Sequence, residues 1–527
     1  MTEAAPLTAG DGWEPVLAAA LLGAERAPPA APGPLADFIA EADAGGALLA
    51  RLAAHGALHR AGAGLRPEAL VTTEPREAFG PECPFAAATR LYGFLVGGHA
   101  ARRRLEEWCA LAAAAGMRAP VWLLQALAPH RDTLPEAVDR VAGPELAWLA
   151  RACGEGAAEA TEGPADWTEG TLGERRAAFA AFRAHDPEAA RAALEPDFRK
   201  EKADLREALV EALETRLSQA DELFLEACLD DRGGGVRLAA QRLLPRLAGS
   251  RYAARMAERA RAALRIEGKR RLLGGTTDTL VVTLPEESSD LARDGVAANT
   301  WESRGGGTRA ALLRGILARA PLHAFAEHPP RLWIELALRS EWSEPIVDGL
   351  FSTIQRTRDP AWTHAAADVL AEAYAEKIKG VRRTNPLLGL WAQALDLLPG
   401  AEWEARVADQ IRDRRIETVL ALLARGPEHF SAPFSAALLD WLALVSRGSD
   451  SLRKDLAKGW IVERLAERLA PSDAAASAAA AILARSDEAE GERLHNQLTT
   501  LAETLALRAA MRRDFQPVTT TGESTRG

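Results

Sequence analysis

From residue 172 onward, with one interruption, the sequence is a succession of short helical segments, and this feature constrains the fold most. Most segments are bounded by glycine or proline, which end helices. Asp186-Pro187 and Asp359-Pro360 each combine an N-cap residue with proline at the first helical position, a strong start signal. Hydrophobic residues make up 48% of the chain, mostly alanine and leucine, while β-branched residues are sparse. The pattern predicts an all-α protein, an α-solenoid of HEAT-like repeats in two halves.

One short region interrupts the helices and favours strands. Thr279 to Leu284 is the only dense run of strand-favouring residues. The preceding "LLGGTT" predicts a turn, with Arg270 to Leu273 as the partner strand. A lone hairpin is marginally stable, so we expect it to lie on helices. The predicted segments are a disordered N-terminus 1–12, an N-terminal helical domain 13–171, HEAT-like repeats 172–265, a β-containing insertion and linker 266–310, a C-terminal helical domain 311–513 and a disordered tail 514–527.

The stretch "DDRGGGVRLAAQRLLPRL", Asp230 to Leu247, raises the question of a phosphate-binding loop because three glycines precede a helical pattern. Such a loop needs G-x-x-x-x-G-K-[ST] or G-x-G-x-x-G after a strand, and neither spacing occurs here. The glycines therefore predict a turn between two helices. Pro245 predicts that the second helix bends or ends there. One buried face is predicted by residues that recur at helical spacing: Val236, Ala240, Leu243 and Leu247.

Residues 232–271 are strongly basic although the chain has a formal net charge of −10. Twelve arginines and lysines stand there against two glutamates. The candidate partner-binding ridge of this run consists of Arg251, Arg255, Arg259 and Arg265. The first three repeat every four residues and would line one helical face, suited to an acidic protein partner or to nucleic acid. The other interpretation is that neighbouring acidic helices, such as 200–214, neutralise the run.

Sequence motifs for catalysis or metal binding are not found. No G-x-S-x-G elbow occurs, and no histidine has an evident nucleophile partner. His55 and His59 are four residues apart, as in some zinc sites, but Gly56 weakens the helix and no metalloprotease glutamate accompanies them. The four cysteines form no C-x-x-C pair, so we expect reduced, buried thiols. We predict no catalytic residues, no cofactor and no metal site.

The ends and the apolar runs of the chain predict its compartment. The N-terminal "MTEAAPLTAGDG" lacks a basic region followed by an apolar core, so we expect no signal peptide. No uninterrupted apolar run reaches the roughly 18 residues that span a bilayer. The acidic balance favours solubility. We therefore expect a cytoplasmic protein.

Part of this chain resembles a HEAT repeat. "DDRGGGVRLAAQRLL" is similar to the pattern D-x-x-x-x-V-R-x-x-A, met here by Asp231, Val236, Arg237 and Ala240. The resemblance implies that the aspartate caps a helix and that valine and alanine face the neighbouring helix. It also implies that the arginine ties adjacent repeats together.

The whole chain resembles an uncharacterised bacterial family of helical proteins. The family's W-x(6)-A-L-L-G-x-x-R motif is met by Trp13, Ala20 to Gly23 and Arg26, and "VTLPEE", "RDGV" and "RLWIELALRSEW" are also similar. Genes of that family often neighbour MoxR-type AAA+ ATPases and von Willebrand factor A proteins. The resemblance implies a protein partner from one of those classes. We expect a non-catalytic scaffold or adaptor, with a nucleic-acid-binding helical-repeat protein as the alternative.

Overall fold

The protein is described from a computed structural model, and its chain forms two compact units, residues 1–79 and 80–527. The structure describes residues 18, 20–23, 43–60, 80–97, 99–152, 167–270, 276–297, 307–458, 461–486 and 491–516. The predicted disordered N-terminus and most of the predicted disordered tail lie outside these residues. The boundary between the units falls inside the predicted segment 13–171.

The first unit contains the helix α2 (Ala44–Arg60). His55 and His59 belong to this helix, but their side chains lie outside the described residues. Of the family-like motif at the start of the chain, residues 20–22 end a helix and Gly23 follows at φ 91°, a conformation that favours glycine. Trp13 and Arg26 lie outside the described residues.

The second unit is mostly helical. It begins with α3 (Phe85–Val96), α4 (His99–Ala114), α5 (Leu124–Leu127) and α6 (Pro135–Ala152). Then come α7 (Leu172–His185), α8 (Pro187–Leu194), α9 (Ala203–Ala212), α10 (Glu222–Cys228), α11 (Gly234–Leu243), α12 (Arg251–Ala263), α13 (Ser289–Arg293), α14 (Gly307–Arg319), α15 (Pro330–Arg339), α16 (Ser343–Thr357) and α17 (Pro360–Tyr374). The last are α18 (Asn385–Leu395), α19 (Gly400–Arg412), α20 (Ile416–Leu423), α21 (Ala432–Val445), α22 (Asp450–Lys458), α23 (Ile461–Arg468), α24 (Asp473–Leu483) and α25 (Glu492–Asp514).

Several helix starts confirm the signals in the sequence. Asp186 accepts hydrogen bonds from the first backbone N–H groups of α8, and Asp359 accepts one from Trp362 in α17. Gly233 is the N-cap of α11, so it lies in the turn between α10 and α11, whereas Gly234 and Gly235 are already the first residues of the helix. Helix α11 ends at Leu243, and Pro245 lies in the short 3-10 helix Leu244–Arg246 that follows.

A two-stranded antiparallel hairpin interrupts the helices, as predicted, but its first strand was placed wrongly. The strands are β1 (Leu264–Arg270) and β2 (Thr276–Val282), with Leu264 opposite Val282. The partner strand is therefore not Arg270 to Leu273. The reason is that α12 runs directly into β1 at Leu264, which is buried against the helices. The hairpin contacts α12 and α15, as expected for a ribbon that needs helical support.

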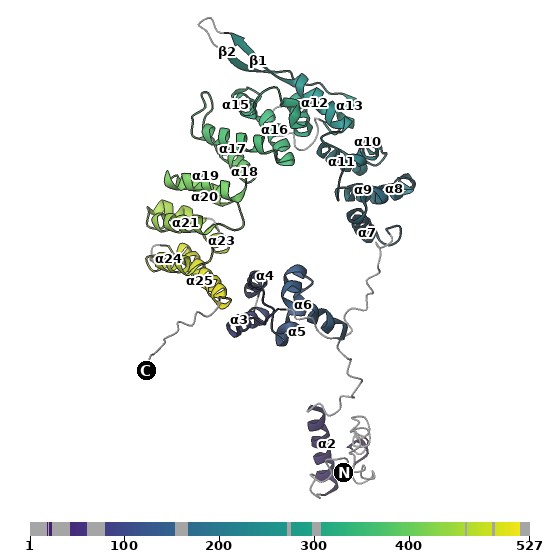
Figure 1. Cartoon of the computed structure of the whole chain (residues 1–527), viewed down its shortest axis with the longest axis vertical. Helices are drawn as coiled ribbons and strands as arrows, with labels where there is room; N and C mark the ends of the chain where they lie inside the picture. Colours follow the sequence, from purple (N-terminus) through teal and green to yellow (C-terminus); the bar gives the residue numbers. More distant parts are fainter. Residues whose placement is uncertain are drawn as a thin grey trace, which may run out of the picture. The chain divides into compact units, whose positions relative to one another are not determined.

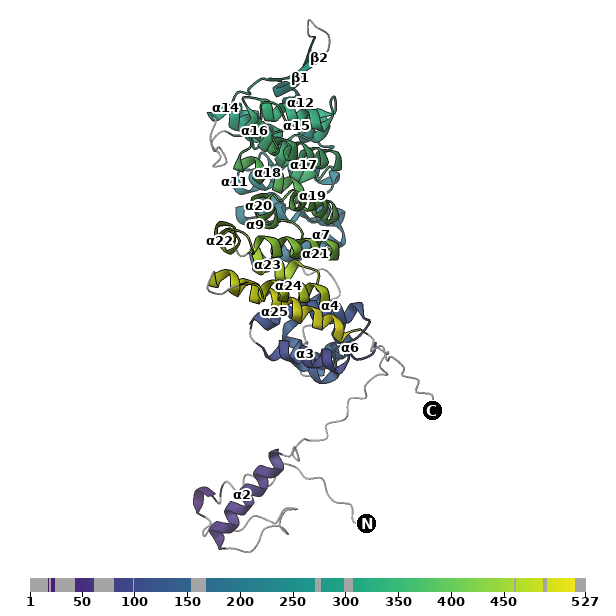
Figure 2. The ribbon, with the colours of Figure 1, turned by 90° about the vertical axis from the view of Figure 1, so that its left-hand side faces the viewer.

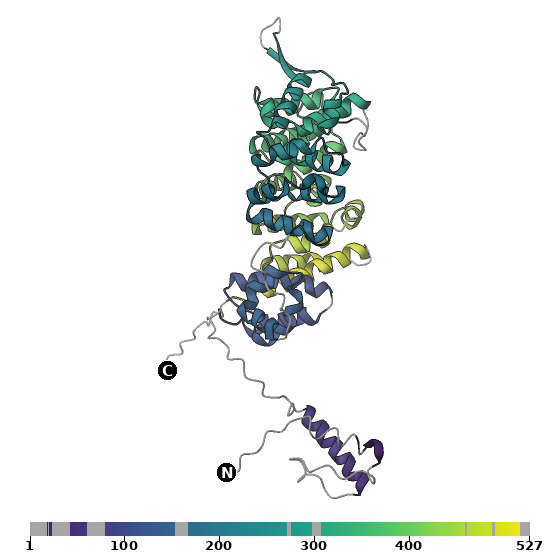
Figure 3. The same ribbon diagram turned by 90° about the vertical axis from the view of Figure 1, so that its right-hand side faces the viewer.

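From α7 onward the helices follow one another side by side in chain order (Figure 1). Many contact the helix two positions later, as α7 contacts α9, α9 contacts α11, α14 contacts α16 and α15 contacts α17. Turned views show the same succession from either side (Figures 2 and 3). One continuous core of buried apolar side chains runs from Phe179 to Leu505. Within the described residues, no helix is both long enough and apolar enough to cross a membrane.

Four buried or half-buried arginines connect successive helices, because each donates hydrogen bonds to carbonyl groups at or just beyond the end of another helix. Arg183 donates to Leu213 O and Thr215 O beyond α9, and it also pairs with buried Asp221. The other three arginines bind carbonyl groups in the same way. Arg356 donates to Ala318 O and Ala320 O. Arg468 donates to Leu423 O, Arg425 O and Pro427 O, and Arg508 donates to Ala466 O and Leu469 O. The last carbonyls of a helix have no partner within it, so these guanidinium groups satisfy them. Burial lowers the pKa of Arg356 and Arg468 to about 10, so both stay cationic at neutral pH.

The last helix packs against the first helices of the second unit. Met511 and Phe515 join a separate core built from α3 to α6, and the Phe515 ring lies 5.4 Å from Trp108 between centroids. Arg508 on α25 donates to Glu107 on α4 at 2.8 Å, and Arg90 on α3 donates to Asp514 at 2.6 Å. Residues more than 400 positions apart thus share one core.

Candidate functional site

The predicted basic ridge lies on α12, and two of its members form ion pairs within the protein. Arg255 Nη2 lies 2.8 Å from Asp294 Oδ1, and Arg259 Nη1 lies 2.6 Å from Asp294 Oδ2. Arg255 also pairs with Glu226 of α10 at 3.0 Å. Hydrogen bonds from Arg255 to Asp294 and Glu226 raise its pKa further above the usual arginine value. These two arginines are held by carboxylates rather than left open to a partner.

Asp294 is the centre of this cluster and is only 2% exposed as a side chain. Its backbone carbonyl accepts a hydrogen bond of 2.7 Å from the buried Tyr252 hydroxyl, also on α12. The preceding residue, Arg293, pairs with Asp230 at 2.7 Å. The cluster therefore fastens the segment after α13 to α12 and to the turn between α10 and α11.

The other two ridge members are exposed. The Arg251 side chain is 74% exposed and lies 3.9 Å from Glu222, while Arg265 pairs with Glu267 on its own strand at 2.8 Å. Elsewhere in the basic run, Arg242 pairs with Glu211 and Arg246 with Glu214, both at 2.5 Å. These contacts agree with the interpretation that acidic residues of the 200–214 region neutralise the run.

The residues that match the HEAT pattern have partly different roles from those that the resemblance implies. Val236 and Ala240 are buried, as expected for residues that face neighbouring helices. Asp231 accepts from Gly233 N at 2.7 Å, which caps the turn, and from Arg206 of α9 at 2.8 Å. Arg237 donates to Asp231 O at 2.7 Å within its own turn. Arg206, rather than Arg237, therefore ties this turn to the preceding helix pair.

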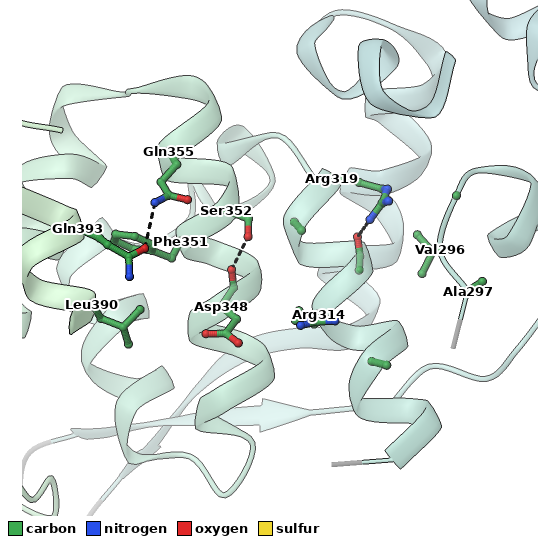
Figure 4. Close-up of a pocket in the computed structure, with 14 residues that line it drawn as sticks. Val296, Ala297, Arg314, Arg319, Asp348, Phe351, Ser352, Gln355, Leu390 and Gln393 are labelled. Atoms are coloured by element: carbon green, nitrogen blue, oxygen red, sulfur yellow. Dashed lines mark hydrogen bonds between the residues drawn. The ribbon is translucent and has the colours of Figure 1, made fainter. Parts of the chain in front are cut away.

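A polar groove of about 320 Å³ lies across α14, α16 and α18, with residues 295–297 at one edge (Figure 4). Its polar lining comes from Arg314, Arg319, Asp348, Ser352, Gln355 and Gln393. Phe351 and Leu390 add apolar surface. Sequence reasoning missed this groove because its lining residues carry no motif and come from segments about 40 positions apart.

Two amide side chains, one from α16 and one from α18, lie next to each other in the groove. Gln355 Nε2 lies 3.4 Å from Gln393 Oε1, a contact between α16 and α18 (Figure 4). Burial raises the pKa of Asp348, and Glu344 one turn earlier adds to the effect. An amide pair can donate to and accept from a peptide group, so this lining suits hydrogen bonding to a polypeptide.

An apolar surface is exposed on the core formed by α3 to α6. Phe85, Tyr92 and Val96 lie on one face of α3, and they are 83%, 49% and 61% exposed. Trp122, 59% exposed, lies with its ring 6.2 Å from the Tyr92 ring. We call Phe85, Tyr92, Val96 and Trp122 the aromatic surface. The sequence did not identify this surface, because no motif marks it and its exposure depends on which faces the neighbouring helices cover.

Several described side chains bear on the sequence predictions for metal-binding and reactive residues. No group of three or more His, Cys, Asp or Glu side chains among them could hold a metal ion. Cys83, Cys109 and Cys228 are free and buried. Burial raises their pKa to about 11, 12 and 12, which keeps the thiols protonated.

A family model described as "Family of unknown function (DUF5691)" matches residues 15–515. No curated protein and no solved structure matches the chain.

Proposed function

The chain belongs to the DUF5691 family of unknown function, and from its surface we propose that it is a non-catalytic scaffold or adaptor that binds a protein partner. The succession of helix pairs and the repeated buried arginines support an α-solenoid with HEAT-like repeats. In such a fold each pair buries its apolar face on its neighbours and leaves a long surface for partners.

The observation that carries this proposal is the aromatic surface. Large exposed apolar patches are uncommon on monomers and mark interaction sites. Tryptophan and tyrosine also dominate the binding energy of protein interfaces because they bury much area at little entropic cost. Tyr92 and Trp122 are residues of these two types, and both lie in the exposed apolar patch.

The proposed partner is a protein of the AAA+ ATPase or von Willebrand factor A classes, which the family resemblance implies, and the proposed compartment is the cytoplasm. The polar groove with Gln355 and Gln393 is a second surface that suits a polypeptide. The proposal does not depend on Arg255 and Arg259, because both are occupied by Asp294.

Nucleic-acid binding through residues 232–271 is the alternative, but the structure supplies little support for it. Within residues 232–271, the described arginines with a carboxylate within 4 Å are Arg242, Arg246, Arg251, Arg255, Arg259 and Arg265. Such pairing leaves less charge for phosphate groups. If this alternative is correct, duplex DNA binds in a gel shift at low salt, and the affinity falls steeply as salt rises.

Affinity purification with a double variant tests the scaffold proposal. We expect Tyr92→Ser/Trp122→Ser to lose a protein that co-purifies with the wild-type chain from its own source. The matched control is Leu223→Ser/Leu238→Ser, which removes two side chains that are 65% and 63% exposed on α10 and α11. The control should retain the partner. Equal recovery with the aromatic-surface variant would refute the assignment of this surface.

A further inference from the structure

A second cavity, of about 530 Å³, lies among α21, α22, α24 and α25 and is lined mainly by basic side chains. Helix α22 contacts α25, and both can be followed in Figure 2. The basic residues of the lining are Arg447, Arg453, Lys454, Arg485, Arg493 and His495. Glu492 is the carboxylate among the described lining residues. In a chain of net charge −10, this is a local concentration of positive charge.

Three of these arginines come from three different places in the fold. Arg447 follows α21, Arg485 follows α24 and Arg493 begins α25. Among the described residues, none of the three has a carboxylate within ion-pair distance. Cations after the ends of α21 and α24 are favoured by the helix dipoles. That effect accounts for the residue type, but it does not account for the arrangement of three such groups around one cavity.

Two further features of the lining suit an anion. Helix α25 has 23 residues, and its N-cap, Gly491, provides no side-chain cap. The first N–H groups of a helix attract phosphate when they are uncapped. His495 Nδ1 lies within hydrogen-bond distance of Ser486 Oγ, at 2.9 Å, and Ser486 Oγ lies 2.8 Å from Leu483 O. This bond fixes the ring at the cavity wall.

We propose that this cavity binds a small ligand that carries a diphosphate or triphosphate group, held by Arg447, Arg485 and Arg493. Guanidinium groups recognise phosphate oxygens through paired hydrogen bonds. The volume lies within the range of about 300–1,000 Å³ that is typical of small-molecule sites. The site lies on elements other than those of the aromatic surface, so this inference is independent of the protein-binding proposal.

Calorimetric titration of the full chain tests the proposal with inorganic tripolyphosphate and with ATP, both without divalent cations. We expect saturable binding of one tripolyphosphate per chain. The variant Arg447→Gln/Arg485→Gln/Arg493→Gln should weaken it at least about a hundredfold, because each charge-assisted contact contributes about tenfold. ATP that binds like tripolyphosphate indicates recognition of the phosphate chain alone, and ATP that binds tenfold tighter adds a nucleoside contact.

The matched control is Arg131→Gln/Arg140→Gln/Arg412→Gln, which removes the same charge from exposed surface pairs elsewhere. We expect this control to bind within about threefold of the wild type. Glu492→Gln should bind several-fold tighter, because it removes a negative charge from the lining. An equal loss in the control, or no saturable binding by the folded wild-type chain, would overturn the proposal. Circular dichroism shows that each variant is folded.

Discussion

Arg259 Nη1 on α12 lies 2.6 Å from Asp294 Oδ2, a carboxylate that follows α13 and is almost fully buried. Arg255 reaches the other oxygen of the same carboxylate at 2.8 Å. Two arginines that look like an exposed ridge in the sequence therefore neutralise one internal charge. Their first role is to hold the segment after α13 on the helices.

Asp294→Asn should destabilise the protein by about 3 kcal/mol, because it leaves two guanidinium groups without their shared buried carboxylate. Equilibrium urea unfolding measures the change. The control is Asp230→Asn, which removes a carboxylate that is 63% exposed and pairs with Arg293. A surface pair of this kind contributes about 0.2–1 kcal/mol. Equal losses in both variants would contradict a structural role for the buried pair.

Gly349 marks the closest approach of α14 and α16. A Cβ atom there would lie 2.6 Å from Leu317 Cβ and 2.9 Å from Arg314 O. Gly349→Ala should therefore push the helices apart and cost about 1–3 kcal/mol in thermal or urea unfolding.

Gly389, inside α18, is the control for this change, because a Cβ atom there meets nothing within 4 Å. Gly389→Ala should stabilise the protein by about 0.5–1 kcal/mol through helix propensity. If Gly349→Ala were also stabilising, the two helices would not cross as closely as described.

The buried thiols predict how stability depends on pH. The pKa of Cys83 is raised to about 11 and that of Cys109 and Cys228 to about 12, from 9.0 in each case, chiefly through burial. Between pH 9 and these values the folded chain keeps protons that the unfolded chain has lost. Their contribution to stability is complete below pH 9 and disappears as pH rises through 11 to 12. Urea unfolding of the wild type should show this fall.

Thiol titration checks the same three residues at constant pH. In a Cys153→Ser variant at pH 8, Cys83, Cys109 and Cys228 should react with a disulfide reagent only after urea is added. Rapid reaction of any of them in the folded protein would show that its environment is more open than the structure indicates.

His364 should titrate above its usual pKa of 6.5. Its Nδ1 lies 2.6 Å from Pro360 O and its Nε2 lies 2.8 Å from Glu402 Oε2, so both ring nitrogens face acceptors. The backbone carbonyl raises the pKa most, followed by Glu402. Proton NMR measures the shift, which Glu402→Gln should reduce. Stability gained from the imidazolium is full below pH 6.5 and declines as pH rises through the raised pKa.

Local signals predicted the helical fold well because capping and chain breaking are properties of neighbouring residues. Asp186 and Asp359 cap their helices as their sequence context indicates, and Gly233 lies in the turn that precedes α11. The first strand was placed wrongly because its limit depends on α12 running into β1 without a turn residue. Leu264 fits the apolar pattern of the helix and is also the buried first residue of the strand, so the sequence alone does not show where the helix ends and the strand begins.

The candidate sites were less predictable because their groups meet only in the folded chain. Asp294 lies 35 positions from Arg259, and nothing in the spacing identifies it as the partner. The same holds for Gln355 and Gln393, which come together through the pairing of α16 with α18. Exposure of Tyr92 on α3 and of Trp122 in the 3-10 turn Val121–Leu123 also depends on which faces the neighbouring helices cover.

Phe515→Ala tests how the last helix supports the first helices of the second unit. Phe515 is 8% exposed and lies against the fully buried Trp108 of α4. Loss of a buried aromatic ring lowers the free energy of unfolding by about 3–5 kcal/mol, and we expect the core of α3 to α6 to be the region that is destabilised. Hydrogen exchange by mass spectrometry should then show exchange at least about a hundredfold faster in α4, with α14 and α16 unchanged.

The control is Leu444→Ala on α21, which removes a side chain that is 53% exposed and should alter neither region. Faster exchange throughout α14 and α16 in the Phe515 variant would mean that the two cores unfold as one. Unchanged exchange in α4 would mean that the end of α25 is not part of that core. The expected result, a local effect, follows because Met511 and Phe515 belong to the core of α3 to α6, whereas Leu505 belongs to the core of the long helical row.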